Sequence, residues 1–189
     1  MGQKVDLSQL GTNPFTAKDL KDYGFGQNEL RKLLRAGDVV RIGRGVYQVS
    51  TSDLDEENQF RGAAKRIRGP SAVCLLSALS YYNLTDEIPR KVWLLVDANR
   101  RSYQRDIRLF RSRDPRWKVG IEKADGYWIT NAERTIVECL THQKQLGQLG
   151  IEALKRALKD KKTKLGKVMD MAAKLDVSHR VLPYIQAFS

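Results

Sequence analysis

The stretch from residue 15 to residue 49 reads FTAKDLKDYGFGQNELRKLLRAGDVVRIGRGVYQV and carries helix, turn and strand signals in close succession. Thr16, followed three residues later by Asp19, approximates a capping box, in which side-chain oxygens accept hydrogen bonds from backbone amides at a helix start. A helix is therefore predicted to begin near Ala17. Gly24-Phe25-Gly26 interrupts it, because glycine permits the positive φ of a tight turn.

A second helix is predicted from Gln27 to Ala36. Leu30, Leu33 and Leu34 recur at helical spacing and form an apolar side that can pack inward. The opposite side is polar and basic, and it carries Asn28, Arg31, Lys32 and Arg35, with Gln27 at the helix start. One side of this helix is therefore expected to pack, and the other to be free and cationic.

A hairpin is predicted after this helix. Gly37 ends the helix, and the β-prone runs Val39–Ile42 and Val46–Val49 follow it. Gly43-Arg44-Gly45 joins the two runs, so a single arginine stands at the tip. A helix, a turn, a helix and a hairpin in this order predict a winged helix-turn-helix, with Arg41 and Arg44 in the wing.

This arrangement has a chemical consequence, because an α-helix fits the major groove of B-DNA. There, Asn and Gln can pair with adenine, and Arg or Lys with guanine. Arg44, held between two glycines, suits a minor-groove or phosphate contact. The predicted DNA-binding residues are Gln27, Asn28, Arg31, Lys32, Arg35, Arg41 and Arg44. The alternative is a winged helix that binds protein and whose basic face is only solvated.

The composition of the chain agrees with a polyanionic partner. The 189 residues carry a formal net charge of +12, which favours nucleic acid over an anionic membrane or an acidic protein. Residues 1–50 hold eight basic and five acidic residues, so most of the excess lies further along the chain. The longest apolar runs are too short to span a bilayer, and no secretory signal opens the chain, so a cytoplasmic protein without membrane contact is expected.

Two domains are expected, with a polar junction near residue 51: a winged helix-turn-helix over 1–51 and a mixed α/β domain over 52–189. The run Ala72–Leu79 is apolar nearly all round and predicts a buried helix. A sheet of about four strands is predicted from Val92–Val96, Ile107–Leu109, Trp117–Ile121 and Tyr127–Ile129. A helix capped by Thr130 and three further helices over 150–160, 163–175 and 178–188 complete an α+β fold.

A second basic surface is predicted in the C-terminal domain. Between Arg90 and Lys118, ten Lys or Arg residues stand against three Asp residues. Arginines flanking an aromatic ring can grip phosphates and stack on a base or a partner's ring. The residues concerned are Arg100, Arg101, Tyr103, Arg105 and Arg108. The alternative is a solvated face of an ordinary sheet.

Signatures of catalysis are weak. His142 and His179 have no ligands at metal-binding spacing, and no Walker loop or nucleophile elbow occurs. No catalytic residue, metal or cofactor is therefore expected, and Cys74 and Cys139 are expected to be buried and reduced. Glu122-Lys123, with Asp97, imitates part of a metal-dependent nuclease signature, but the spacer and a clear partner acid are missing.

Three stretches resemble the AbiEi antitoxin family, the regulator half of bacterial abortive-infection (type IV) toxin-antitoxin systems. The first runs from Phe15 to Tyr47. The second is SAVCLLSALSYYNLTD over residues 71–86, with Ile88-Pro89 and Val92-Trp93-Leu94 after it. The third is ERTIVECL over residues 133–140, similar to the family's Arg-Thr-hydrophobic-hydrophobic-acid helix.

The resemblance covers roughly residues 13–145 and implies a function. It implies an N-terminal domain that binds inverted operator repeats and represses its own operon, and a C-terminal domain that counteracts a nucleotidyltransferase-like toxin. Such antitoxins are described as acting without a stable complex with the toxin. Because one winged helix reads few base pairs, a dimer or cooperative loading on DNA is expected. A freestanding regulator without a toxin is the alternative.

Overall fold

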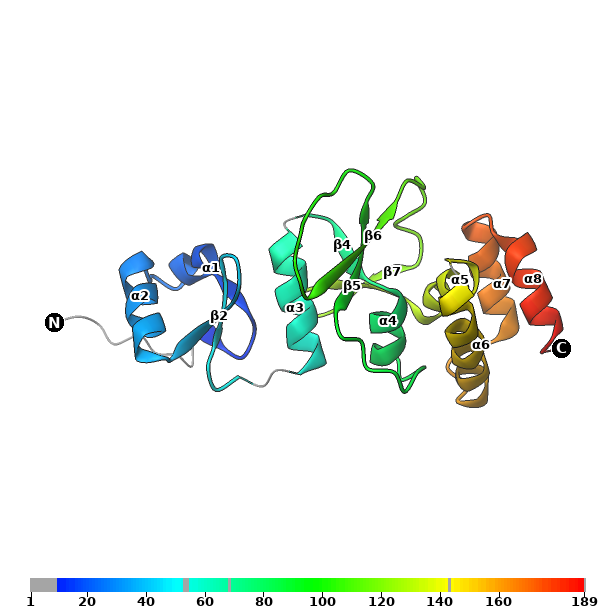
Figure 1. Ribbon diagram of the computed structural model, residues 1–189, viewed down its shortest axis with the longest axis horizontal. Helices are drawn as coiled ribbons and strands as arrows, with labels where there is room; N and C mark the ends of the chain where they lie inside the picture. Colours follow the sequence, from blue (N-terminus) through cyan, green and yellow to red (C-terminus); the bar gives the residue numbers. More distant parts are fainter. Residues whose placement is uncertain (1–9, 53–54, 68, 143, 189) are drawn as a thin grey trace. The chain divides into compact units, whose positions relative to one another are not determined.

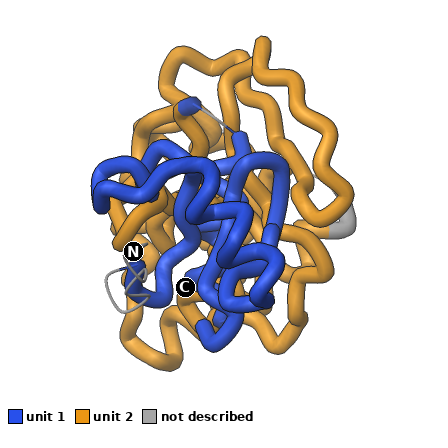
Figure 2. The backbone as a smooth tube through the Cα atoms, turned by 90° about the vertical axis from the view of Figure 1, so that its left-hand side faces the viewer, with its two compact units in different colours: residues 1–69 blue, residues 70–189 orange. Residues whose placement is uncertain are grey.

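The chain divides into two units, an N-terminal unit of residues 1–69 and a C-terminal unit of residues 70–189 (Figure 2). The computed structural model describes residues 10–52, 55–67, 69–142 and 144–188. Each unit has its own sheet, and their described residues together form eight helices. The fold class is therefore α+β, as predicted.

The N-terminal unit contains three helices and a three-stranded antiparallel sheet (Figure 1). The strands are β1 (Phe15–Thr16), β2 (Val39–Gly43) and β3 (Val46–Val49), in the order β1-β3-β2. The helices are α1 (Ala17–Asp22), α2 (Gln27–Ala36) and α3 (Glu56–Ile67). The predicted order of helix, turn, helix and hairpin is thus present between residues 15 and 49.

The helix starts and stops follow the predicted local signals. The Asp19 amide donates to the Thr16 hydroxyl at 3.2 Å, and the Asp19 carboxylate accepts from the Thr16 amide at 2.9 Å. This is the expected capping box of α1. Gly37 ends α2 in the left-handed conformation, with φ +78°, which glycine adopts without a steric penalty.

Helix α3 belongs to the N-terminal unit, whereas the boundary predicted after residue 51 would assign it to the C-terminal domain. Lys65 pairs with Asp19 of α1 at 2.5 Å, and Arg66 donates to the Ile42 carbonyl of β2 at 3.4 Å. A Cβ at Gly62 would lie 3.0 Å from the Ile42 side chain, so α3 approaches β2 closely at that point. These contacts, between residues far apart in sequence, move the observed boundary to residue 69.

The Asp19–Lys65 pair gives a first prediction. Burial raises the pKa of Asp19, but the hydrogen bonds from Lys65 and Thr16 outweigh it, and the net pKa is lowered. A carboxylate with a lowered folded-state pKa stabilises the fold above its unfolded pKa and loses that effect as pH falls. Asp19→Asn should therefore lower the free energy of unfolding by about 1 kcal/mol near neutral pH. The difference from wild type should shrink in acid.

Urea denaturation at several pH values measures this effect. Asp22→Asn is the matched control, because Asp22 is an exposed acid of the same helix with no ion pair in the described structure. A deficit for Asp19→Asn that does not change between neutral and acidic pH would contradict the electrostatic explanation.

The C-terminal unit is built on one five-stranded mixed sheet. Its strands are β4 (Ser71–Val73), β5 (Val92–Asp97), β6 (Ile107–Ser112), β7 (Ile121–Lys123) and β8 (Trp128–Thr130), in the order β6-β5-β4-β8-β7. The β5–β6 and β4–β8 pairs are parallel, and the β4–β5 and β7–β8 pairs are antiparallel. Strand β6 therefore lies at one edge of this sheet.

Two predicted elements of this unit differ in the structure. The predicted helix 72–79 is split, because residues 71–73 form β4 and α4 covers only Leu75–Tyr81. A continuous apolar run does not distinguish a buried strand from a buried helix, and pairing with β5 and β8 decided the outcome here. The predicted strand 117–121 is mostly turn, and β7 begins at Ile121.

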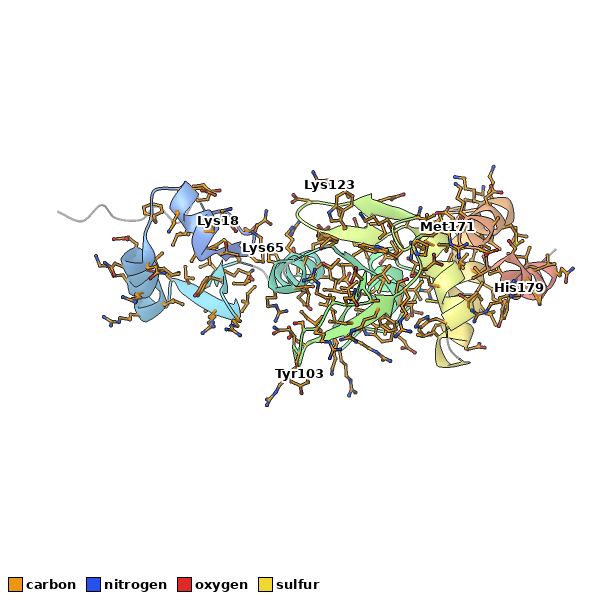
Figure 3. The ribbon with its side chains drawn as sticks, turned by 90° about the horizontal axis from the view of Figure 1, so that it is seen from above. Lys18, Lys65, Tyr103, Lys123, Met171 and His179 are labelled. Atoms are coloured by element: carbon orange, nitrogen blue, oxygen red, sulfur yellow. The ribbon has the colours of Figure 1, made fainter. Side chains whose placement is uncertain are left out.

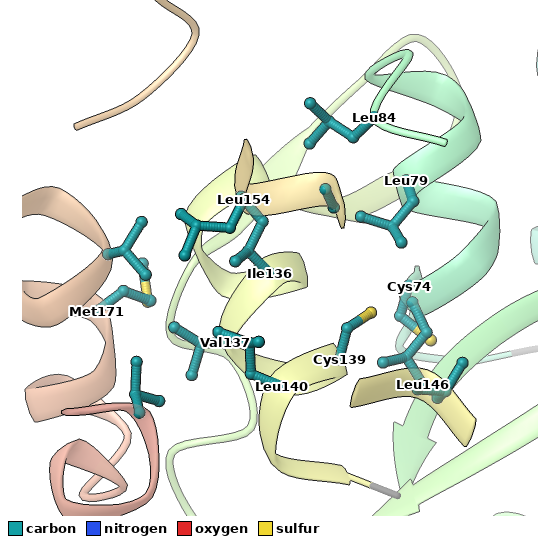
Figure 4. Close-up of a cluster of buried hydrophobic side chains, with 14 of the residues drawn as sticks. Cys74, Leu79, Leu84, Ile136, Val137, Cys139, Leu140, Leu146, Leu154 and Met171 are labelled. Carbon is teal, nitrogen blue, oxygen red and sulfur yellow. The ribbon is translucent and has the colours of Figure 1, made fainter. Parts of the chain in front are cut away.

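Four helices follow the sheet: α5 (Ala132–His142), α6 (Lys144–Lys159), α7 (Leu165–Lys174) and α8 (Ser178–Gln186). Leucines, isoleucines and valines from α4 to α8 form one core (Figure 4). Cys74 and Cys139 lie in this core as free thiols, and burial raises the pKa of both. None of the described helices is long and apolar enough to cross a membrane.

Candidate nucleic-acid interface

Helix α2 presents one packed side and one exposed side. Leu30 and Leu33 are 5% and 7% exposed and pack with Phe15, Leu20 and Val39 in the core of the N-terminal unit. All five predicted DNA-facing residues of the helix are exposed: Gln27, Asn28, Arg31, Lys32 and Arg35. The leucines therefore fix the rotation of α2 about its axis, and that rotation turns the polar and basic residues to solvent.

The turn before α2 has a defined geometry. Gly24 adopts φ +80°, and its amide donates to the Lys21 carbonyl at 2.8 Å. The Phe25 amide donates to the Leu20 carbonyl at 3.2 Å, and the Phe25 ring packs against the core. These hydrogen bonds and the packing of Phe25 fix the position of α2 relative to α1 and the core of the unit.

The basic side chains on the exposed face of α2 have no acidic partner among the described residues. The one acid of this face, Glu29, turns back to accept from the Gly26 amide at 3.0 Å. Within the described residues, no ion pair involves Arg31, Lys32 or Arg35. The Asn28 side-chain oxygen accepts from Arg31 at 3.5 Å, which leaves most guanidinium donors of Arg31 available. Three cations and two amide side chains are thus available to an anionic partner.

The β2–β3 hairpin carries the other two predicted residues. Its turn consists of Arg44 and Gly45, with Gly45 at φ +72°, and the Arg44 side chain is exposed. Arg41 is also exposed, and its Nε donates to the Gly43 carbonyl at 3.0 Å. Arg41 therefore supports the turn through one nitrogen, whereas Arg44 at the tip has no ion pair among the described residues.

Arg66 of α3 supports the hairpin and was not among the predicted site residues. Its Nη1 donates to the Ile42 carbonyl, and its side chain lies so close to Gly43 that a Cβ there would overlap it. In the sequence, Arg66 looks like one of several basic residues that complement the dipole of a helix end. Only the position of α3 against β2 reveals its contact with the base of the hairpin.

The residues of the second predicted basic surface lie on two elements of the structure. Arg108 belongs to β6, and the other four lie in the loop before that strand: Arg100, Arg101, Tyr103 and Arg105. Arg108 pairs with Trp93 across the β5–β6 ladder, and its guanidinium carbon lies 4.3 Å from the centre of the Trp93 ring. Arg111 is three residues further and points to the opposite face, because side chains alternate along a strand. Arg101, Tyr103 and Arg111 line a separate hollow of about 500 Å³. Arg108 therefore does not share a face with that group.

Residues that imitate a nuclease signature lie apart. Asp97 ends β5, whereas Glu122 and Lys123 belong to β7, and β4 and β8 lie between these strands. Three strand spacings separate them, or about 14 Å. His142 packs its ring against Phe110 at 5.3 Å. The described residues contain no group of three or more His, Cys, Asp or Glu that could hold a metal ion.

The helix that carries ERTIVECL has a structural role in this unit. Arg134 is only 3% exposed, and it donates through Nε and Nη2 to one oxygen of Glu138 at 3.0 and 2.9 Å. Its Nη1 donates to the carbonyls of Trp117 and Val119. Arg134 thereby holds the turn before β7 against α5, away from any exposed surface.

Comparison with known proteins identifies one part of the chain. Residues 6–50 match the family model described as transcriptional regulator, AbiEi antitoxin. This range includes α1, α2 and the β2–β3 hairpin, and therefore every predicted DNA-binding residue. No curated protein matches the chain. Through residues 6–50, the chain is thus similar to the AbiEi antitoxin transcriptional regulators, which supports the resemblance predicted from its sequence.

Proposed function

We propose that this protein is a transcriptional autorepressor whose N-terminal unit is a winged helix-turn-helix that reads an operator upstream of its own operon. One observation carries the proposal. Within the segment that matches the AbiEi regulators, α2 packs its leucines inward and presents Arg31, Lys32 and Arg35 to solvent with no acidic partner in the described structure. A duplex supplies the acidic groups that this face lacks.

In the proposed complex, α2 lies in the major groove. Gln27 and Asn28 can read adenine there, and Arg31, Lys32 and Arg35 can read guanine or bind phosphates. Arg44, at the hairpin tip, reaches the minor groove or the backbone beside it. Arg41 belongs to the same wing and keeps its turn in place. An inverted repeat is the expected operator, occupied by a dimer or by two copies that load cooperatively.

The family match further supports an antitoxin role, in an AbiE-like type IV system used in abortive infection and phage defence. In this role the cytoplasmic protein counteracts a nucleotidyltransferase-like toxin, functionally and without a required stable complex. The gene neighbourhood tests this part of the proposal. A nucleotidyltransferase-like gene beside this one supports it, and the absence of such a gene favours the freestanding regulator.

Operator binding is tested by fluorescence anisotropy, with the purified full chain, its own upstream DNA and a shuffled duplex, at several salt concentrations. We expect the native sequence to bind at least tenfold more tightly, and the affinity of both duplexes to fall with salt as counterions are released. Arg44→Ala should weaken binding to the native duplex by about 1 kcal/mol or more, or roughly fivefold.

Arg113→Ala is the matched control for charge, because Arg113 is an exposed arginine of the C-terminal unit. Equal binding to the native and shuffled duplexes would refute sequence readout. If Arg44→Ala and Arg113→Ala weaken binding equally, the hairpin contributes only its charge.

A further inference from the structure

The loop between β5 and β6, residues 98–106, is held at both of its ends. Where it begins, Asp97 accepts from the Asn99 amide through its carboxylate at 2.7 Å, and from the Arg100 amide through its carbonyl at 3.0 Å. Where it ends, the Ile107 amide donates to the Gln104 carbonyl at 3.3 Å. A hydrogen-bonded turn at each end therefore fixes where the loop leaves β5 and where it enters β6.

This loop carries an exposed aromatic side chain, Tyr103. Tyr103 is 89% exposed, and no aromatic ring or cation among the described residues stacks on its ring. Figure 3 shows Tyr103 projecting away from the ribbon, with nitrogen-tipped side chains beside it. A tyrosine ring has two apolar faces and a polar edge, so full exposure leaves stacking surface that a planar ligand can cover.

The charge around this ring has one sign. From residue 98 to residue 113, the chain carries six arginines and one acid, Asp106. Arg101 and Arg105 are exposed, and no ion pair involves them within the described residues. The arginines on either side of Tyr103 can therefore bind anionic groups spaced along an extended partner.

The hollow beside Tyr103 has a size and lining that suit a nucleotide. Arg101, Ser102, Tyr103 and Arg111 line it together with Ala98, and its volume is about 500 Å³. The Nε of Arg111 donates to the Arg100 carbonyl at 2.9 Å, which holds the guanidinium in place. Four other N–H donors of Arg111 remain for a phosphate or a base edge.

We propose that these residues form a second nucleic-acid site, the Tyr103 surface (Arg101, Ser102, Tyr103, Arg105 and Arg111), which binds single-stranded nucleic acid. A base stacks on Tyr103, and the neighbouring phosphates bind Arg101, Arg105 and Arg111. In a duplex, the faces of the bases are already stacked on one another and are not available to Tyr103, whereas the bases of a single strand can stack on its ring. The site belongs to the C-terminal unit, and none of its residues is among the proposed operator contacts.

The test measures binding of the full chain to labelled single strands of about 12 nucleotides by fluorescence anisotropy, with unlabelled single strands and duplexes as competitors. We expect single strands to compete better than duplexes of unrelated sequence. Tyr103→Ala should weaken binding about tenfold, and Tyr103→Phe should retain it, because stacking needs the ring and not the hydroxyl. Comparing the affinities of an RNA and a DNA single strand of the same sequence shows which sugar the surface prefers.

Three variants separate this site from the operator site. Tyr23→Ala removes a half-exposed tyrosine of the N-terminal unit and should leave single-strand affinity unchanged. Arg31→Ala with Arg35→Ala should also leave the single-strand affinity unchanged. Tyr103→Ala should leave the affinity for the native upstream duplex unchanged. Tyr103→Leu tests stacking directly. Binding by Tyr103→Ala or Tyr103→Leu as tight as wild type, or equal competition by duplex, would overturn the proposal.

Discussion

Replacing Arg31 and Arg35 together by alanine is expected to weaken binding to the native upstream duplex about a hundredfold. Both side chains are exposed on the face of α2 opposite the buried leucines. A side chain that reads a base contributes about 1 to 3 kcal/mol, so the loss of two such contacts amounts to roughly 3 kcal/mol. The preference for the native over the shuffled duplex should fall with it, because the lost contacts carry sequence information.

Anisotropy titrations of both duplexes measure this preference. Lys159→Ala with Lys167→Ala is the matched control, because it removes two exposed charges from helices of the C-terminal unit. The control should lower both affinities slightly and leave their ratio unchanged. Circular dichroism should report the same helix content for both double variants, since all four side chains lie outside the core. A sequence preference that survives in Arg31→Ala/Arg35→Ala would show that α2 is not the reading helix.

Arg134→Met is expected to destabilise the fold by about 3 to 5 kcal/mol, the largest stability effect predicted for this chain. The substitution keeps a long apolar side chain in a site that is 3% exposed. It removes the donors for the Trp117 and Val119 carbonyls, and it leaves the Glu138 carboxylate buried without its cation. Urea denaturation followed by circular dichroism measures the loss.

Two further variants show which lost interaction accounts for the lower stability of Arg134→Met. Glu138→Gln keeps a polar acceptor and should cost less than Arg134→Met. Arg134→Met with Glu138→Leu removes both charges, and should regain part of the loss because no ion is left unpaired. A double variant no more stable than Arg134→Met would show that the lost carbonyl contacts, rather than the unpaired carboxylate, dominate.

The effect should also depend on pH in a defined direction. Burial raises the pKa of Glu138, and Arg134 opposes that rise. Without Arg134 the folded-state pKa should rise further above the unfolded value. A carboxyl with a raised folded-state pKa stabilises the fold below its unfolded pKa, and loses that contribution as pH rises through the folded pKa. The deficit of Arg134→Met should therefore be smaller at about pH 5 than at about pH 7.5, and a larger deficit at the lower pH would contradict this explanation.

Much of the N-terminal unit was predictable because its signals are local. The capping box of Thr16 and Asp19, the glycine turn before α2, the spacing of Leu30 and Leu33, and the glycine hairpin each act within a few residues. Such signals depend on backbone geometry and helical period, which a sequence displays directly. The same holds for the later helices, although α6 begins at Lys144, earlier than the predicted residue 150.

The candidate interfaces were predictable to different degrees. The exposed face of α2 followed from periodicity alone. Periodicity alone did not arrange the second basic surface, because four of its residues lie in the loop before β6, whereas Arg108 lies on that strand with its guanidinium over the Trp93 ring. Arg66 was missed for a related reason: its contact with the hairpin base exists only because α3 lies against β2.

By itself, the sequence determined the α+β class, the order of the helices and the hairpin at residues 15–49, and the net positive charge. Tertiary structure alone decided that residues 71–73 form a central strand, that α3 belongs to the N-terminal unit, and that Arg134 is a buried structural residue. The physical reason is the range of the interactions. Caps, turns and helical periodicity connect neighbours along the chain, whereas strand pairing and burial connect residues whose separation in sequence carries no local signal.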